Sequence, residues 1–431
     1  MKLKKIMVIA LSAIMTLSLG ACGSSANSTS STTKKKIVIW AWDDTFNVLA
    51  AKEAKAAYQK TNKNVDVQVV SMSQDDIVQK LNTDLSSNVT TGLPDIVLIE
   101  DYRSQNFLKS YPDSFKDITK EVKISDFMDY KVKSATLDGK TYGVPFDSGV
   151  AALFYRTDLI EQAGYTKKDM ENLTWDKFIE IGKAVKAKTG KLMVAQDPAD
   201  LGIVDMMLQS AGQWYVKSDG KTVNLQNNVA LKSALSTYKR MQDAGIVKPI
   251  SGWNQTLSAF QSGDVAAIPS GCWMSSSVVK SQGAGKWAAT EIPRLADVKS
   301  SVNYSNTGGS AWYVLSKAQN PDGAADFLGK TFASDKTLLN TLADKINLVS
   351  TLKTASTGSN YNKAFDFYGG QKILQDFSAW AKKVPSVNYG LYTRNIQDIL
   401  KVTIQSVVKN NANIDSSLSE AQKQAEAAVS K

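Results

Sequence analysis

The chain of 431 residues contains no histidine and only two cysteines, Cys22 and Cys272. The absence of histidine excludes the Ser-His-Asp and Cys-His arrangements of nucleophilic catalysis and removes the most common zinc ligand. Two cysteines cannot build a framework of several disulfide bonds. We therefore expect no catalytic triad and no zinc site of the usual type. We also predict no other metal site and no cofactor.

The chain also lacks a hydrophobic run long enough to cross a bilayer as a helix. The apolar run at the amino terminus, Ile6–Leu19, is shorter than the roughly 20 residues that such a helix needs. Lysines at positions 2, 4 and 5 precede it and small residues follow it. Basic residues before a short apolar run are typical of a secretory signal. We therefore predict that residues 1–21 are a signal peptide.

One of the two cysteines follows this run directly. The sequence Leu19-Gly20-Ala21-Cys22 resembles the lipobox of bacterial lipoproteins, which implies cleavage before Cys22 and lipidation of its thiol. Residues 23–33 are Gly, Ser, Thr, Ala and Asn only, a composition that cannot bury enough apolar surface to fold. Residues 22–36 are therefore predicted to be a lipidated cysteine and a flexible tether. The alternative is an ordinary signal peptide that is cleaved near Ala21, with Cys22 incidental.

The formal net charge of the chain is +10, but no strongly basic patch accompanies it. Lysines and arginines are interspersed with aspartates and glutamates along stretches of helical periodicity. This pattern is typical of a solvated surface, and it favours a protein that does not bind nucleic acid. The length after the tether exceeds that of one compact domain and predicts two.

The body of the chain alternates between strand-like and helix-like segments. Residues 35–42, 65–72 and 93–101 are rich in β-branched and apolar residues, and helical periodicity connects them. Ser73 and Thr174 stand where helices would begin, and Gly190 stands where one would end. Strand–helix alternation of this kind predicts an α/β fold with mostly parallel sheets.

Aromatic and acidic residues gather in segments that follow the expected strands or lie near their edges. In open α/β sheets, the loops at the carboxyl ends of the strands line the ligand crevice. We therefore expect ligand-facing side chains among the following residues: Trp42, Asp43, Asp44, Asp101, Asp147, Trp214, Trp253 and Trp273.

Six segments of the chain form a specific ordered set. The strongest are "YGVPFDSGVAALFYRTD" and "FQSGDVAAIPSGCW"; "IVIWAW", "LPDIVLIED", "TWDKFIEIGKAV" and "GGSAWYVLSK" complete the set. Taken in order, the set resembles the extracellular solute-binding proteins of bacterial ABC sugar importers, in particular the oligosaccharide group that includes maltose-binding protein.

This resemblance implies a two-lobed fold like that of the periplasmic binding proteins. Each lobe would be a mostly parallel sheet flanked by helices, with the ligand cleft between the lobes. Lobe 1 is expected to comprise residues 37–146 and 308–348, and lobe 2 residues 147–307 and 349–431. Crossover segments between the lobes are expected at 144–150, 305–310 and 346–350.

The resemblance also assigns functions to individual residues. Trp214 and Trp273 match positions of stacking aromatics, whereas Asp147 matches the acid at a crossover. Asp101 and the Asp43-Asp44 pair match polar positions of the first lobe. Gly308 and Gly309 would let the backbone approach the ligand. Trp253 and Arg394 are added from their positions in loops.

The function implied is capture of a neutral di- to tetrasaccharide and its delivery to the permease subunits by hinge closure. The protein would be a monomer on the extracellular face of the cytoplasmic membrane of a Gram-positive-type cell, held only by the lipid anchor. Two alternatives stay open from the residues themselves. One is a secreted glycoside hydrolase in which carboxylates such as Asp101 and Asp147 act as acid and base. The other is a binding protein for a polyamine, iron or a peptide.

Overall fold

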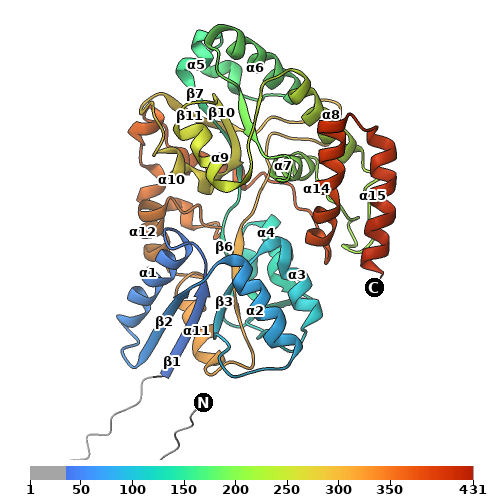
Figure 1. Ribbon diagram of the computed structural model, residues 1–431. Helices are drawn as coiled ribbons and strands as arrows, with labels where there is room; N and C mark the ends of the chain where they lie inside the picture. Colours follow the sequence, from blue (N-terminus) through green and yellow to red (C-terminus); the bar gives the residue numbers. More distant parts are fainter. Residues whose placement is uncertain (1–34, 431) are drawn as a thin grey trace, which may run out of the picture. The chain divides into compact units, whose positions relative to one another are not determined.

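The computed structural model describes residues 35–430 (Figure 1). The predicted signal peptide, Cys22 and nearly all of the predicted tether lie outside the described residues. No helix within residues 35–430 is both long and apolar enough to cross a membrane.

Lobe 1 is built on a five-stranded sheet with the order β2-β1-β3-β12-β6. β1 runs parallel to β2 and β3, whereas β12 runs antiparallel to β3 and β6. The strands are β1 (Lys35–Ala41), β2 (Val65–Ser71), β3 (Ile96–Glu100), β6 (Gly143–Asp147) and β12 (Ser310–Val314). A hairpin of β4 (Thr136–Leu137) and β5 (Lys140–Thr141) lies outside this sheet.

Helices cover both faces of this sheet, because its strands are apolar on both sides. Successive residues such as Ile39 and Trp40 belong to different hydrophobic clusters, as the two-residue period of a strand requires. The first cluster includes residues of α1 (Asn47–Gln59), α11 (Pro321–Lys330) and α12 (Lys336–Ile346). The second includes residues of α2 (Gln74–Ser86) and α3 (Asp101–Ser110). α4 (Asp129–Ala135) follows α3 in the chain.

Lobe 2 contains a three-stranded sheet with the order β10-β7-β11 and a parallel pair, β8-β9. Both neighbours of β7 run antiparallel to it, so the prediction of a mostly parallel sheet is wrong for this lobe. Strand–helix alternation does not specify strand direction when the chain enters and leaves a lobe through crossovers. The strands are β7 (Ala151–Arg156), β8 (Val194–Gln196), β9 (Val247–Pro249), β10 (Ala267–Gly271) and β11 (Trp287–Glu291).

The helices of lobe 2 form two layers around β7. Leu153 and Tyr155 belong to one core cluster and Ala152 and Phe154 to another. The helices are α5 (Thr157–Gln162), α6 (Trp175–Thr189), α7 (Gly202–Ser210), α8 (Val229–Asp243), α9 (Gly252–Gln261), α10 (Ser275–Val278), α13 (Ile373–Ala381), α14 (Thr393–Asn410) and α15 (Ile414–Val429).

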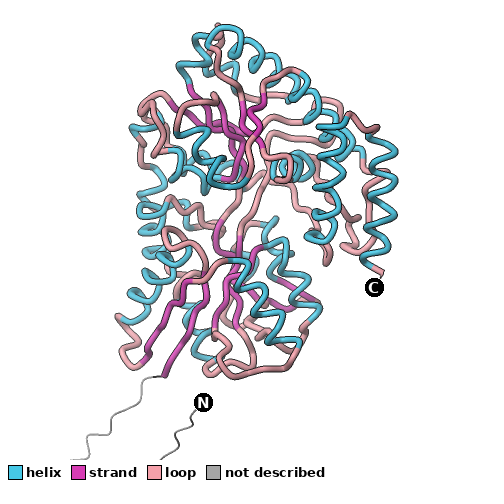
Figure 2. The backbone as a smooth tube through the Cα atoms, in the orientation of Figure 1, coloured by secondary structure: helices cyan, strands magenta, loops and turns pink. Residues whose placement is uncertain are grey.

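Three stretches of chain connect the two lobes and pair with one another (Figure 2). Asp147 forms an isolated bridge with Ser350, and Val150 forms one with Asn306. The backbone N–H of Thr307 donates to the carbonyl of Gly149 over 2.7 Å. The crossover segments therefore lie side by side where the chain passes between the lobes.

Local signals in the sequence correspond closely to the helix ends. The side chains of Ser73 and Thr174 accept hydrogen bonds from backbone N–H groups three residues later, and Gly190 ends α6 in the left-handed conformation. These helix ends depend only on neighbouring residues, so the sequence predicts them directly.

Candidate functional site

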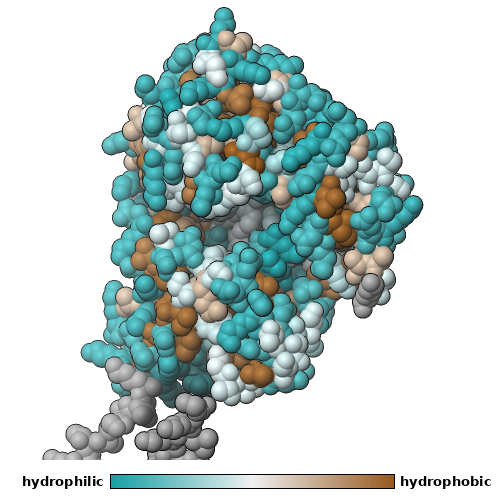
Figure 3. All heavy atoms as spheres, viewed as in Figure 1, coloured by the Kyte–Doolittle hydropathy of each residue, from teal (hydrophilic) through white to brown (hydrophobic). Residues whose placement is uncertain are grey.

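Two cavities between the lobes share part of their lining and are called here the first and the second chamber. The first chamber has a volume of about 440 Å³ and the second about 530 Å³. Four residues line both: Glu100, Trp253, Trp273 and Gly308. Figure 3 shows a hollow between the lobes on the face that it draws. Each volume falls within the range of pockets that bind small ligands.

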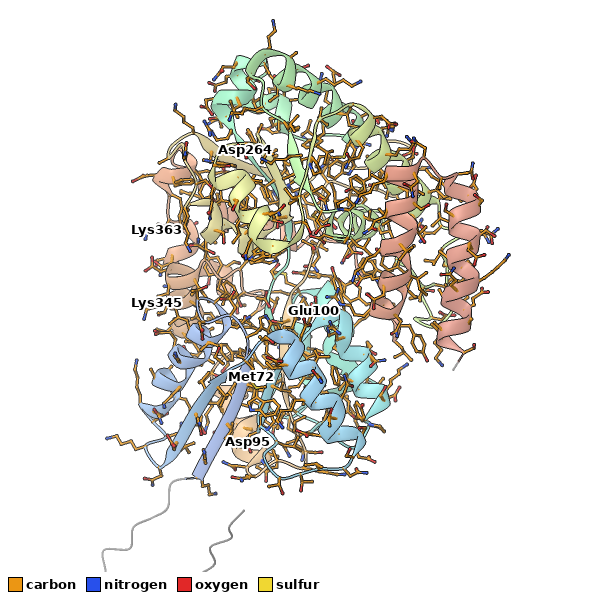
Figure 4. All side chains as sticks on the ribbon, in the orientation of Figure 1. Met72, Asp95, Glu100, Asp264, Lys345 and Lys363 are labelled. Carbon is orange, nitrogen blue, oxygen red and sulfur yellow. The ribbon has the colours of Figure 1, made fainter. Side chains whose placement is uncertain are left out.

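The sheet of lobe 1 directs its carboxyl-terminal edge at this cleft. Figure 4 shows Asp95, which precedes β3, at the far end of lobe 1, and Glu100, the last residue of β3, next to the space between the lobes. Trp42, directly after β1, lines the second chamber. Lobe 1 therefore presents to the cleft the carboxyl ends of its parallel strands, the edge beyond which open α/β sheets bind their ligands.

Two tryptophans of lobe 2 form the aromatic part of the cleft. Trp253 on α9 is 50% exposed. Trp273, in the turn after β10, is less exposed than Trp253. Their ring centroids lie 5.9 Å apart at an interplanar angle of 47°. The indole N–H of Trp273 donates to the carbonyl of Thr307 over 3.2 Å, which fixes the ring. The two rings therefore offer apolar surface to both chambers.

Polar groups of lobe 1 line the second chamber. Asp147 is buried, and its Oδ1 atom accepts a hydrogen bond from the backbone N–H of Ser310 over 2.8 Å. Asp43 lines the same chamber and accepts hydrogen bonds from the N–H and hydroxyl of Thr45. Asp44 is exposed and lines neither chamber. The structure thus brings Trp42, Asp43 and Asp147 together and leaves Asp44 outside.

Lobe 2 contributes an acidic floor to the first chamber that the sequence analysis missed. Asp197 and Asp200 follow β8, and Asp205 lies on α7. Asp205 is buried, which raises its pKa to about 7 although Tyr215 and Gln397 donate hydrogen bonds to it. Because β8 is only three residues long, its period is too short to identify the loop that follows it.

An ion pair in the lining of the first chamber joins the two lobes. Arg394, the second residue of α14, donates from Nη2 to Oε1 of Glu100. Its Nη1 donates to Gln397 over 2.9 Å, and its guanidinium lies 5.3 Å from the centre of the Tyr102 ring. Arg394 was predicted as a site residue from its position alone. Glu100 and Tyr102 were missed, although they flank the predicted Asp101.

Asp101 does not lie in the cleft, contrary to the sequence prediction. Its side chain is 2% exposed and is paired with Lys131, which is completely buried. Lys131 also donates to the carbonyl oxygens of Asp147 and Ser310 over 3.0 and 3.1 Å. Because a buried ammonium needs this full set of acceptors, Asp101 is fixed as its counter-ion. In this conformation Asp101 is a structural residue.

Trp214 also lies outside both chambers, contrary to the expectation that it stacks on a ligand. It is 2% exposed, and its indole N–H donates to the hydroxyl of Thr393 over 2.8 Å. Its ring packs 5.4 Å from that of Tyr102. Trp214 therefore supports Tyr102 from behind and does not face the cleft. The motif "SAGQWY" thus contributes an aromatic side chain to the layer behind the lining of the first chamber.

The two glycines differ in what their lack of a side chain permits. Gly308 lines both chambers, and the approach of its backbone to a ligand stays a prediction. Gly309 lines the second chamber, but it has a φ of 93° and a Cβ atom there would lie 2.8 Å from Nζ of Lys131. The buried Asp101–Lys131 pair thus requires glycine at position 309.

Comparison with known proteins agrees with this architecture. Residues 53–367 match the family model described as bacterial extracellular solute-binding protein. A lactose-binding protein of Rhizobium radiobacter is 46% identical over 376 residues, which cover 87% of this chain and 88% of that protein.

Solved structures share the fold at low sequence identity. The sugar-binding protein MalE of Xanthomonas citri superposes with a TM-score of 0.76 at 18% identity, covering 92% of this chain and 98% of that one. An ABC-transporter-associated binding protein of B. animalis subsp. lactis, solved with β-1,6-galactobiose, gives 0.72 at 22% identity, covering 90% and 96%. The two lobes, the crossovers and the matched model together show that this chain belongs to the bacterial extracellular solute-binding protein family.

Proposed function

We propose that this protein is the binding component of an ABC importer, and that it captures a neutral oligosaccharide of two to four units between its lobes. The observation that carries the proposal is the composition of the cleft, where paired tryptophans stand opposite carboxylates. Aromatic rings pack against the C–H faces of pyranose rings, and carboxylates and amides hydrogen-bond to hydroxyl groups. Hinge closure would then present the loaded protein to the permease.

The relatives support a β-galactoside as the first ligand to test. The protein that is 46% identical is named for lactose, and one structure of the same fold was solved with galactobiose. We propose Trp253 and Trp273 as the stacking residues. We propose Asp43, Asp147, Asp197 and Glu100 as partners of the hydroxyl groups, because each lines a chamber.

We also propose that the protein is a monomer anchored by lipid at Cys22 on the extracellular face of the membrane. The lipobox-like sequence and the extracellular family support this location. Cys22→Ser should release the protein from the membrane fraction without changing its affinity for sugar. A loss of sugar affinity in the released variant would mean that the amino terminus does more than tether.

Binding without catalysis is the reading that the geometry favours over a glycoside hydrolase. Of the two carboxylates considered for acid–base chemistry, Asp101 is buried against Lys131 and cannot reach a ligand. The named relatives are binding proteins as well. We therefore propose that the sugar leaves the cleft unchanged.

The test is a titration of the Cys22→Ser protein with lactose, galactobiose, maltose and the polyamine putrescine. We expect a neutral disaccharide to change the tryptophan fluorescence and to raise the melting temperature, since a ligand that binds only the folded state stabilises it. Prolonged incubation with lactose should release no galactose. A response to putrescine alone would overturn the sugar assignment, and release of galactose would overturn the assignment as a binding protein.

A further inference from the structure

We propose that Arg394 and Tyr102, with Glu100, form an end wall of the first chamber that limits the length of the saccharide. This inference rests on the proposed function and adds to it a residue-level basis for selectivity. The wall is the ion pair between Glu100 in lobe 1 and Arg394 in lobe 2, together with the Tyr102 ring beneath the guanidinium.

A further cavity lies on the other side of this wall. It has a volume of about 250 Å³ and is called here the rear groove. Tyr102 and Arg394 line both the rear groove and the first chamber. These two residues are therefore the partition between the two cavities.

The rear groove has the chemistry of a site for sugar units. Three amide side chains line it: Asn82, Asn106 and Asn395. Asn82 already donates to the carbonyl of Val78 and accepts from the hydroxyl of Tyr111. Asn106 and Asn395 each carry an amide with both a donor and an acceptor, the combination that hydroxyl groups require. A saccharide that extended past the wall would therefore find hydrogen-bond partners in the groove, whereas the wall prevents it from arriving there.

The guanidinium of Arg394 is fixed on the lobe 2 side. Gln397 accepts from Arg394 over 2.9 Å and itself donates to the buried Asp205 over 2.9 Å. Arg394 therefore keeps one orientation through a chain of hydrogen bonds that ends in the core of lobe 2.

Tyr102 is fixed from three directions. Its ring lies 4.7 Å from that of Tyr389 and 5.4 Å from that of Trp214, and its hydroxyl accepts from the N–H of Gly308 over 3.2 Å. Because packing and hydrogen bonds hold both side chains while the lobes are in this arrangement, the wall excludes a ligand from the rear groove. A flexible surface side chain would instead move aside.

The experiment compares Arg394→Ala with the wild type in calorimetric titrations of lactose and of two longer series. One series adds β-galactosyl units at the non-reducing end of lactose, and the other adds glucosyl units at the reducing end. We expect the wild type to bind lactose at least 10-fold more tightly than the tetrasaccharides of one series. In Arg394→Ala, the ratio of the lactose affinity to the tetrasaccharide affinity should fall by about 10-fold or more for that series. For the other series, the ratio should stay unchanged.

Two further variants make the result specific. Arg394→Lys keeps a long cation opposite Glu100 and should retain most of the selectivity. Arg240→Ala removes a guanidinium at the surface of lobe 2, where it is paired with Asp176. Arg240 lines neither the first chamber nor the rear groove, so this variant should leave the ratio unchanged. Melting temperatures check that all variants are folded. If Arg394→Ala does not fold, Arg394→Gln, which shortens and neutralises the side chain, replaces it.

Three outcomes would contradict the proposal that these residues form an end wall. These are a wild type that binds disaccharides and tetrasaccharides equally well, an Arg394→Ala variant that loses affinity for all lengths by one factor, and an equal change of the ratio in Arg240→Ala. Failure of the wild type to bind any saccharide would instead overturn the proposed function, so the two failures are distinguishable.

Discussion

Glu100 and Asp101 are neighbours in the sequence, but their carboxylates belong to different parts of the molecule. Asp101 is paired with Lys131 inside lobe 1, where both side chains are almost completely inaccessible. Glu100 is paired with Arg394 across the cleft, and the Arg394 side chain is 35% exposed. The first pair fixes the ends of β6 and β12 through the carbonyl oxygens that Lys131 contacts. The second borders the cavity in which we propose that the ligand binds.

The two ion pairs consist of the same kinds of charged group, but they contribute differently to stability and to binding. A buried pair is weak evidence for net stabilisation, but the loss of one partner is costly because a charge is left without compensation. A pair at a cleft is partly hydrated, so its contribution to folding is small and its effect falls mainly on the ligand. Substitutions in the inner pair should therefore change stability, and substitutions around the cleft should change binding.

The largest effect is expected from Lys131→Met. This substitution leaves Asp101 buried without its counter-ion and should lower the free energy of unfolding by about 3–5 kcal/mol. Urea denaturation followed by circular dichroism measures it. The double variant Lys131→Met/Asp101→Leu removes both charges and should recover part of the loss. A loss below about 1 kcal/mol in the single variant would mean that the pair is not buried as described.

The next largest effect is a change in the free energy of unfolding with pH, which is caused by protonation of Asp101. Burial raises its pKa to about 6, and Lys131 only partly opposes this. Between pH 4 and 6 the folded state holds a proton that the unfolded state has released. The free energy of unfolding should therefore fall as the pH rises through this window, by at most about 1.4 kcal/mol per unit.

The measurement is urea denaturation at several pH values for the wild type and Asp101→Asn. The difference between the two curves isolates Asp101, and it should decline from pH 4 to 6 and then level off. A difference that rises with pH would mean that Lys131 outweighs burial and lowers the pKa.

Substitution of Trp253, which lines the cleft, should change ligand binding more than stability. Trp253 is half exposed, so Trp253→Ala should change the free energy of unfolding by less than about 0.5 kcal/mol. If the ring stacks on the ligand, its loss should weaken lactose binding by about 2 kcal/mol, or roughly 30-fold. Isothermal titration calorimetry measures the affinity. Trp175→Phe, at a fully buried indole away from both chambers, serves as the contrasting variant and should affect stability alone.

The smallest effect is expected from Arg103→Ala. Its guanidinium lies 3.4 Å from Glu100, and its side chain is 25% exposed. A partly hydrated pair of this kind contributes about 0–1 kcal/mol, less than the inner pair by a wide margin. Thermal unfolding at low and high salt checks this. A cost close to that of Lys131→Met would remove the distinction between the inner pair and the cleft.

Much of the fold could be predicted because its signals are local. The apolar strand at 93–101 is buried as β3, and the predicted caps at Ser73 and Thr174 form. The strand direction in lobe 2 was predicted wrongly because antiparallel pairing of β7 with β10 and β11 brings together segments far apart in the chain. No local pattern encodes that pairing.

The candidate site was predicted only in part, for a similar reason. Trp253, Trp273, Asp147 and Gly308 line the cleft, as the positions of their segments suggested. Asp101 and Trp214 were one layer too deep, and their neighbours Glu100 and Tyr102 were overlooked. A one-residue difference at a strand end reverses the direction of a side chain, so sequence position locates a site segment better than a site residue.

The sequence by itself determined the α/β class, the helix ends and the segments that reach the cleft, since these depend on neighbouring residues and on hydrophobic period. Only the tertiary structure decided which of two adjacent acids faces inward. Lys131 lies 30 residues from Asp101 and Arg394 lies 294 residues from Glu100, so their partners meet only in the folded chain. The function of each carboxylate depends on the side chain with which it is paired in the folded protein and on the solvent exposure of that pair.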